Sequence, residues 1–260
     1  MNQLQVELLE IVNNCPGRAS LSIDICGTSW ELGGREVYKS ASLIKVIILI
    51  EALRQVEQGI YSLNDKFVIT NDSKVGGAGV IQALSDSIEF TYSDLLTLMI
   101  IISDNTATNQ VIELLGFDSI NRCCKDLGLV DTALNRKMMD FGAAQQGREN
   151  VTTSGDMVSC LKKVNEESFL SEVGRAEFLR IMSLQQFQNK LPARIDLEKV
   201  KVANKTGELP GVSHDCALIE FDGKIAYVAV LIDELVVTDD GRTALNLIGE
   251  KVATYLVEGL

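Results

Sequence analysis

The feature that most constrains this chain is residues 40–53, SASLIKVIILIEAL, in which a serine and a lysine open a long apolar run. An apolar run of this length predicts a buried helix. Ser42 and Lys45 are three residues apart, so on a helix they lie on one face. A serine becomes a nucleophile when a base takes its proton, and a lysine in a crowded apolar site can be that base. The stretch therefore predicts a nucleophile beside its base.

Spacing alone is weak evidence for such a pair. Ser159 and Lys162 repeat the same spacing further along the chain. They lie in an ordinary mixed helical pattern, and we interpret them as a coincidence. The first copy differs from the second in the apolar helix behind it and in two motifs that follow it.

Those two motifs are residues 103–105, SDN, and residues 205–207, KTG. Each has an ordinary explanation by itself: the first would cap a helix, and the second would form an exposed strand face. The ordered set of three motifs is far more specific than any one of them. Found together with the Ser–Lys pair, the motifs favour an active site.

Hydrophobic periodicity outlines a helix, strands, a block of helices, more strands and a last helix. We expect helices over residues 2–12, 42–58, 91–102, 107–115, 119–127, 154–165, 171–184 and 242–257. We expect strands over residues 19–26, 200–206, 217–221 and 225–232, and a hairpin over residues 28–38 that turns at Gly33-Gly34. Residues 1–38 and 190–260 would form an α/β lobe, and residues 39–189 an all-helical lobe.

Charge limits the partners of the chain. Its 260 residues hold 24 Lys and Arg against 36 Asp and Glu, a net charge of −12 without a basic stripe. This balance argues against nucleic acid as a partner. It also repels anionic substrates weakly, so an anionic substrate needs a local positive group to hold it.

The sequence shows no sign of export or of membrane insertion. Its first residues lack a cationic segment followed by an apolar core and a cleavage site, and the apolar windows 43–50 and 95–102 are too short to span a bilayer. The six cysteines form neither a disulfide framework nor a zinc-binding pattern. We expect a cytoplasmic protein with free thiols and no metal, although an exported protein trimmed of its signal would look the same.

With these motifs, the chain resembles the class A serine β-lactamase family. The resemblance extends from about residue 19 to the C-terminus and includes residues 76–79, GGAG, and the run TLMIIISDNTATN. It implies a five-stranded antiparallel sheet flanked by terminal helices, an inserted helical domain, and an active site in the cleft between them. It further implies a monomer without a cofactor that acts on a small β-lactam or another acyl compound.

The resemblance also implies roles for the motif residues. Ser42 would attack the lactam carbonyl, Lys45 would take its proton, and Ser103 would pass a proton to the leaving nitrogen. Asn105 would orient Lys45 and the amide of the substrate.

The third motif would bind the substrate. Lys205 and Thr206 would hold a substrate carboxylate, next to Gly207. The family's oxyanion hole corresponds here to the backbone N–H groups of Ser42 and Glu208.

The chain departs from the family in the loop of residues 134–151. Met138 stands where rapidly turning-over members carry the glutamate that activates water, and Gly142 stands where an asparagine usually helps. Methionine cannot accept a proton, so the base for deacylation is absent or has moved. Asp140 and Glu149 are the candidates for a relocated base. The alternative for Asp140 is a capping or ion-pairing residue of the loop.

His214, the only histidine, has no obvious metal or triad partners. We interpret it as a strand residue near the rim of the cleft rather than a catalytic group.

Three functions fit these observations. The first is a β-lactam hydrolase with fast acylation and slow deacylation. A D-alanyl-D-alanine carboxypeptidase or an esterase on the same scaffold is the second, although a cytoplasmic location argues against peptidoglycan as a substrate. The third is a binding protein that is acylated once and stays loaded.

Overall fold

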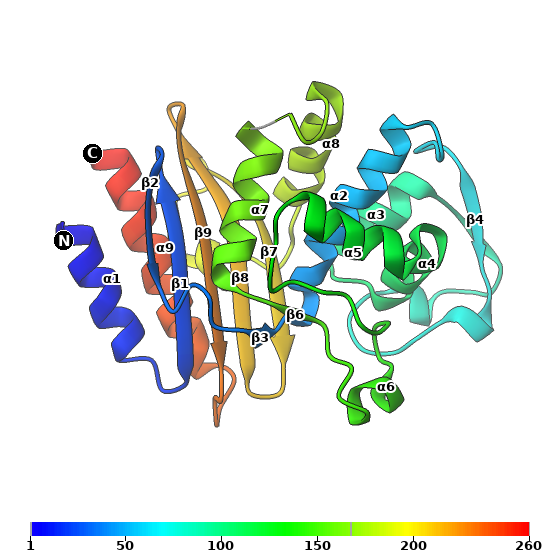
Figure 1. Ribbon diagram of the computed structural model, residues 1–260, viewed down its shortest axis with the longest axis horizontal. Coiled ribbons are helices and arrows are strands. Elements are labelled where there is room, and N and C mark those ends of the chain that lie inside the picture. Colours follow the sequence, from blue (N-terminus) through cyan, green and yellow to red (C-terminus); the bar gives the residue numbers. More distant parts are fainter. Residues whose placement is uncertain (1, 167, 260) are drawn as a thin grey trace.

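A computed structural model describes residues 2–166 and 168–259. A five-stranded sheet runs through its middle, with two helices against one face and the remaining helices beside the other (Figure 1). No helix in the described residues is long and apolar enough to cross a membrane.

The central sheet is antiparallel throughout, with strand order β2-β1-β9-β8-β7. Its strands are β1 (Arg18–Ile25), β2 (Thr28–Leu32), β7 (Lys201–Leu209), β8 (Val212–Phe221) and β9 (Lys224–Asp233). The strands come from both ends of the sequence, so β1 pairs directly with β9. The expected five-stranded antiparallel sheet is confirmed, and β7, which carries the third motif, is one of its edges.

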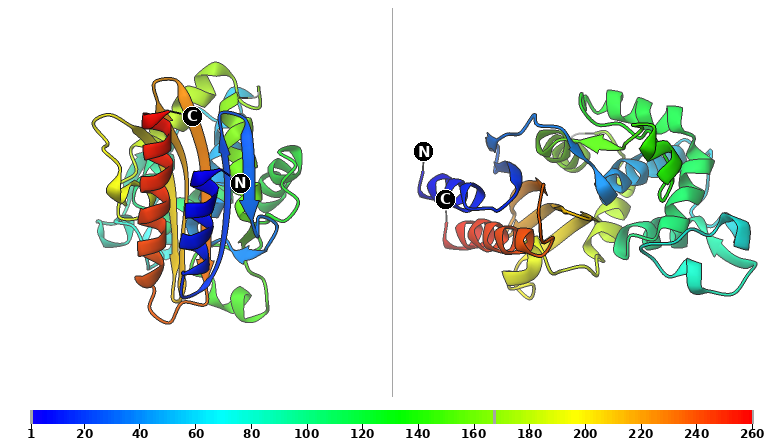
Figure 2. Two further views of the ribbon diagram at one scale, coloured as in Figure 1. Left: turned by 90° about the vertical axis from the view of Figure 1, so that its left-hand side faces the viewer. Right: turned by 90° about the horizontal axis from the view of Figure 1, so that it is seen from below.

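Two terminal helices cover one face of the sheet. They are α1 (Gln3–Asn13) and α9 (Asp240–Glu258), which pack against each other and bring the two ends of the chain together (Figure 2). Buried aliphatic side chains of α1, α9 and the facing side of the sheet form one hydrophobic cluster.

The other helices gather beside the opposite face. They are α2 (Ile44–Glu57), α3 (Tyr92–Ile101), α4 (Asn105–Leu115), α5 (Phe117–Asp126), α6 (Phe141–Gln145), α7 (Ser154–Glu166) and α8 (Glu172–Ser183). Two short ribbons accompany them, formed by β3 (Tyr38–Lys39) with β6 (Val151–Thr152) and by β4 (Lys66–Ile69) with β5 (Ile88–Thr91). Together with the opposite face of the sheet, these helices enclose the second and larger hydrophobic cluster.

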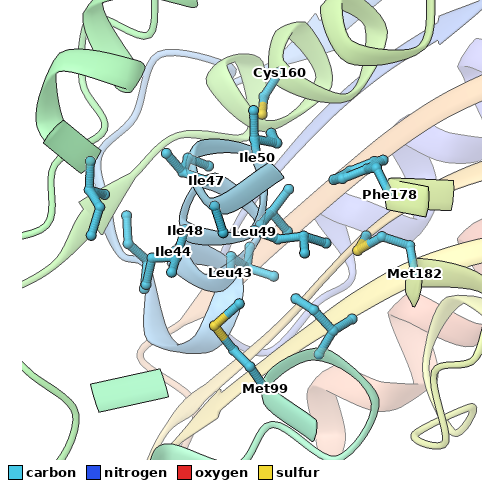
Figure 3. Close-up of a cluster of buried hydrophobic side chains, with 14 of the residues drawn as sticks. Leu43, Ile44, Ile47, Ile48, Leu49, Ile50, Met99, Cys160, Phe178 and Met182 are labelled. Atoms are coloured by element: carbon cyan, nitrogen blue, oxygen red, sulfur yellow. The ribbon is translucent and has the colours of Figure 1, made fainter. Parts of the chain in front are cut away.

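Helix α2 is the centre of that cluster. All of residues 43–53 are buried, which is what a helix apolar on every side requires. The side chains of Met99, Cys160, Phe178 and Met182 surround it (Figure 3). A polar residue at the start of this helix is therefore held in an apolar environment.

One expected turn is wrong. Gly33-Gly34 does not close a hairpin, because β2 ends at Leu32 and the chain continues to β3, which pairs with β6. The hairpin of β2 is with β1 and turns at Cys26-Gly27, where φ is +49° and +85°. A type I′ hairpin turn requires positive φ at both central residues. Cys-Gly is not one of the residue pairs, such as Asn-Gly, that predict this turn from sequence.

Three element boundaries also differ from expectation. The helix expected over residues 42–58 begins at Ile44, and residues 41–43 before it form a 3-10 turn that contains Ser42. Helix α4 begins two residues early, at Asn105, and β8 begins five residues early, at Val212. The expected strand over residues 217–221 stopped short because residues 212–216 include polar side chains, which the structure buries.

Candidate active site

The predicted nucleophile lies at the junction of two cavities. Ser42, Ala78 and Glu208 line both of them, and their volumes are about 200 Å³ and about 310 Å³. The larger cavity adds Ser103 and Thr206, and the smaller one adds Asn105 and Met138 among others. The structure therefore gathers residues from all three motifs around one hollow.

A 3-10 turn presents Ser42 between α2 and the edge strand β7. The turn packs against β7 at Gly207, where an added methyl group would lie 3.2 Å from Ala41 Cβ and 3.3 Å from His214 Cβ. The absence of a side chain at Gly207 thus lets the turn approach the sheet closely. Ser42 itself is half-buried, and its hydroxyl has no hydrogen-bond partner among the described residues.

Lys45 is buried completely and makes three hydrogen bonds. Its Nζ lies 2.7 Å from the carbonyl oxygen of Ser103, 3.0 Å from Ser103 Oγ and 2.9 Å from Asn105 Oδ1. Burial, aided by the nearby charge of Lys205, lowers the pKa of Lys45 well below its usual value. The amine is therefore suited to lose its proton, but it bonds to the second motif rather than directly to Ser42.

Ser103 connects the two lysines of the site. Its Oγ accepts from Lys45 at 3.0 Å and from Lys205 at 3.2 Å. A hydroxyl accepts two hydrogen bonds and donates one, so its own hydrogen is left for a third group. Ser103 lines the larger cavity beside Ser42, which is where such a group would sit.

Several residues at this hollow have strained backbones. Ala41, Ser103 and Met139 line the cavities with φ of +46°, +57° and +63°. Each such residue costs about 1–3 kcal/mol and persists only when its surroundings hold it. Non-glycine residues of this kind cluster at functional sites, which supports placing the function here.

The second motif is fixed by the loop of residues 76–81. Asp104 caps α4 through Ala107 N–H and also accepts from the N–H groups of Val80 and Ile81. Asn105 donates to the carbonyl of Gly76 at 3.1 Å, which turns its oxygen toward Lys45. The capping explanation for Asp104 is therefore correct, and it coexists with a place for Ser103 and Asn105 at the cavity.

The third motif supplies a buried cation. Lys205 is completely buried and donates to Ser103 Oγ and, at 2.8 Å, to the carbonyl of Thr206. Burial lowers its pKa to about 7, although Cys216 and Asp215 nearby favour the charged form. Thr206 and Glu208 follow on the strand, and both line the larger cavity.

Two basic residues at this cavity were not predicted from the sequence. Lys190 is 1% exposed and donates to the carbonyls of Gly207 and His214. Arg242 comes from the first turn of α9. Neither residue lies in a motif. The net negative charge of the chain indicated only that an anionic substrate would need nearby cations, and it did not indicate which residues these are.

The loop of residues 134–151 brings only one of its two candidate bases to the cavities. Met138 is 8% exposed, and its backbone N–H and carbonyl are both bonded to the side chain of Asn109, which fixes the segment against α4. Asp140 caps α6 through Ala143 N–H at 2.9 Å, is exposed, and lines neither cavity. Gly142 lies inside the exposed α6.

Glu149, the second candidate base, does line the smaller cavity. Its carboxylate is paired with Arg136 at 2.9 Å and with Lys39 at 3.4 Å. These two ion pairs engage both of its carboxylate oxygens.

His214 is not at the rim of the cleft, as expected, but is fully buried in β8 behind Gly207. Its Nε2 lies 2.9 Å from the carbonyl of Lys39, and its Nδ1 accepts from Ile232 N–H. Burial lowers its pKa to about 4, so the neutral ring serves as a structural bridge. The adjacent Asp215 is also buried and accepts from Asn204 and from Leu191 N–H; burial raises its pKa to about 6.

No cluster of three or more candidate metal ligands occurs within residues 2–166 and 168–259.

Comparison with known proteins gives a consistent family. A model of the β-lactamase enzyme family matches residues 3–256. A search of curated proteins found no match.

Many solved structures have the same fold. A β-lactamase from Sphaerobacter thermophilus is 27% identical with a TM-score of 0.90, over 99% of this chain and 98% of that one. A mutant of PBP-A, solved as an acyl-enzyme complex with penicillin G, is 26% identical with a TM-score of 0.89, over 98% and 97%. An ancestral class A β-lactamase is 23% identical with a TM-score of 0.88, over 97% and 99%.

The family model spans nearly the whole chain, and these structures share its architecture from end to end. The chain belongs to the β-lactamase enzyme family and has the fold of class A β-lactamases and PBP-A.

Proposed function

We propose that this protein is a serine acyl-transfer enzyme that opens β-lactam rings through an acyl-enzyme on Ser42 and releases the product slowly. The observation that carries the proposal is the shared Ser103 hydroxyl, which joins two buried lysines at a cavity lined by Ser42. Such a cluster holds proton carriers at the place where a nucleophile and a leaving group would be.

In acylation, Ser42 Oγ attacks the lactam carbonyl carbon while its proton goes to neutral Lys45. Backbone N–H groups of Ser42 and Glu208 stabilise the oxyanion, and a donor of this kind contributes about 3 kcal/mol. The carbon–nitrogen bond then breaks, and the nitrogen takes a proton passed from Lys45 through Ser103. The hydrogen bond between Lys45 and Ser103 supports this route.

The binding residues orient the substrate for this attack. Asn105 holds Lys45 and faces the smaller cavity, where it would bind the amide of the substrate. Lys205 and Thr206 would bind the substrate carboxylate, and Gly207 keeps the serine turn against the strand that carries them.

Deacylation requires a base that activates water against the ester. Met138 lines the smaller cavity and has no basic atom, Asp140 caps a helix and lines neither cavity, and Glu149 is held by two cations. These observations favour a slow second step. They also favour the second candidate function, a protein that is acylated once and stays loaded. The PBP-A mutant solved as an acyl-enzyme complex with penicillin G is a structural relative.

Intact-mass spectrometry separates these functions. The protein is mixed with excess benzylpenicillin, and its mass is recorded over time together with the amount of opened lactam. An adduct on Ser42 with many turnovers supports a hydrolase, and a persistent adduct with one turnover supports an acyl trap. The absence of both adduct and turnover would contradict the proposal and favour peptidase or esterase substrates.

A further inference from the structure

Glu208 places a carboxylate between two cations inside the candidate site. Its side chain lies 3.3 Å from Lys190 Nζ and 3.5 Å from an Arg242 nitrogen. All three residues line the larger cavity, together with Ser42 and Thr206. An anion of the protein itself therefore occupies the most cationic part of the hollow.

The two cations are more firmly held than the carboxylate. The Lys190 side chain is 1% exposed, and two backbone carbonyls accept from its amine. Arg242 is anchored by Asp239 at 3.1 Å. The Glu208 side chain, by contrast, is 48% exposed, and within the described residues its only ion-pair partners are these two cations.

The cations also have unused capacity. The Nε of Arg242 is buried and has no hydrogen-bond partner in the described part of the chain. Buried hydrogen-bond donors without a partner are rare in proteins, because leaving one unpaired costs free energy. A planar guanidinium with a free N–H and a neighbouring ammonium match the geometry of a carboxylate.

We propose that Lys190 and Arg242 extend the carboxylate site of Lys205 and Thr206 into an anion-binding subsite beside Ser42, and that Glu208 fills this subsite until a substrate carboxylate displaces it. This proposal rests on the proposed function for its substrate. The backbone N–H of Glu208 belongs to the strand, so the side chain can move without disturbing the oxyanion hole. Glu208 is then a specificity residue that lowers the preference for carboxylate-bearing acyl compounds over neutral ones.

Kinetics provide the first test. Acylation of Ser42 is measured for benzylpenicillin and for its methyl ester, and the ratio of the two rate constants, kcat/KM or its single-turnover equivalent, is compared between variants. Glu208→Gln should raise the ratio of acid to ester about fivefold, the upper end for a partly exposed ion pair. Adding Arg242→Gln should abolish the gain.

Glu10→Gln on α1 makes the same change in net charge on the other side of the sheet and should leave the ratio unchanged. An unchanged ratio in Glu208→Gln, or an equal rise in Glu10→Gln, would overturn the proposal.

A second measurement does not depend on acylation. The Nε–H resonance of Arg242 is followed by NMR during titration with sodium acetate, with sodium chloride as the ionic-strength control. Glu208→Gln should bind acetate several-fold more tightly than the native protein. If no β-lactam acylates Ser42, the proposed function is wrong, but the titration still shows whether the subsite binds an anion. If acetate does not shift the resonance in either protein, the proposed subsite is wrong.

Discussion

The two sides of the candidate site differ in how their polar groups are arranged. Around Ser42, the side chains of Lys45, Ser103 and Lys205 are buried and joined by hydrogen bonds. Across the smaller cavity, the loop of residues 134–151 presents Met138. The carboxylate of Asp140 caps a helix, and that of Glu149 forms ion pairs. Under the proposed function, the first side would move protons during acylation, and the second would lack a base to complete the reaction.

If the proposed function is correct, the two half-reactions depend on separate parts of the fold. The first depends on a buried helix and an edge strand, which are rigid. The second depends on a surface loop, which tolerates change. A member of this fold can therefore keep the first half-reaction while its loop no longer supports the second.

The largest expected effect comes from removing the nucleophile. Ser42→Ala should abolish the adduct with benzylpenicillin and reduce lactam opening by at least about 10³-fold, because no other hydroxyl has the same surroundings. Ser159→Ala, at the second copy of the same spacing, is the matched control and should react like the native protein. Intact mass and peptide mapping decide, and an adduct that survives in Ser42→Ala would break the comparison at its first side.

The next effect concerns the loop. Met138→Glu should accelerate deacylation about 10²-fold or more, because a positioned general base contributes about 10²–10⁴. The rate is measured by the decay of the acyl-enzyme after excess substrate is removed. An unchanged decay would mean that the missing base is not what limits the second step.

Asp140→Asn sharpens the same comparison. Asparagine caps a helix as well as aspartate does, so only the charge is removed. If Asp140 is a cap alone, the decay of the acyl-enzyme stays as it is. If Asp140 is the relocated base, the variant accumulates a stable acyl-enzyme.

Buried groups beneath β7 should make stability depend on pH in two opposing ways. His214 has a folded pKa of about 4 against 6.5 unfolded, so its contribution is complete above pH 6.5 and is lost as pH falls toward 4. Asp215 has a folded pKa of about 6 against 3.8 unfolded, so protonation regains stability as pH falls from 6 toward 3.8. The two changes partly cancel in the native protein.

Asp215→Asn removes one of these changes. Relative to the native protein, its free energy of unfolding should fall by about 3 kcal/mol between pH 7 and pH 3, the value of about two pKa units. Urea denaturation at a series of pH values measures the difference. A difference that stays constant with pH would show that Asp215 does not titrate across this range.

The last effect concerns the charge of Lys205. Its pKa of about 7 makes it cationic below pH 7 and neutral above. The preference for benzylpenicillin over its methyl ester should therefore fall about tenfold for each pH unit above 7 until other cations dominate. Rates for both compounds between pH 6 and 9 test this, and a preference that does not vary would show that Lys205 keeps its proton or does not hold the carboxylate.

Sequence patterns predicted the sheet, most helices and the meeting of the three motifs, because long apolar runs and ordered motifs depend on local residue types. They missed the hairpin at Cys26-Gly27, because a two-residue turn depends on backbone angles that this residue pair does not predict. They missed Lys190 and Arg242, which reach the cavity from the residue before a 3-10 segment and from the last helix. They placed His214 at a rim because alternation along a strand does not reveal which edge another segment covers.

The central claim is tested most directly by a rapid-mixing experiment with a chromogenic cephalosporin. Fast acylation, together with a loop that supplies no base for deacylation, predicts a burst of ring opening equal to the concentration of protein. A much slower steady rate should follow the burst. The burst should disappear in Ser42→Ala, and the slow rate should rise in Met138→Glu. A linear, rapid release of product without a burst would contradict the account, because it would mean that the second step is not the slower one.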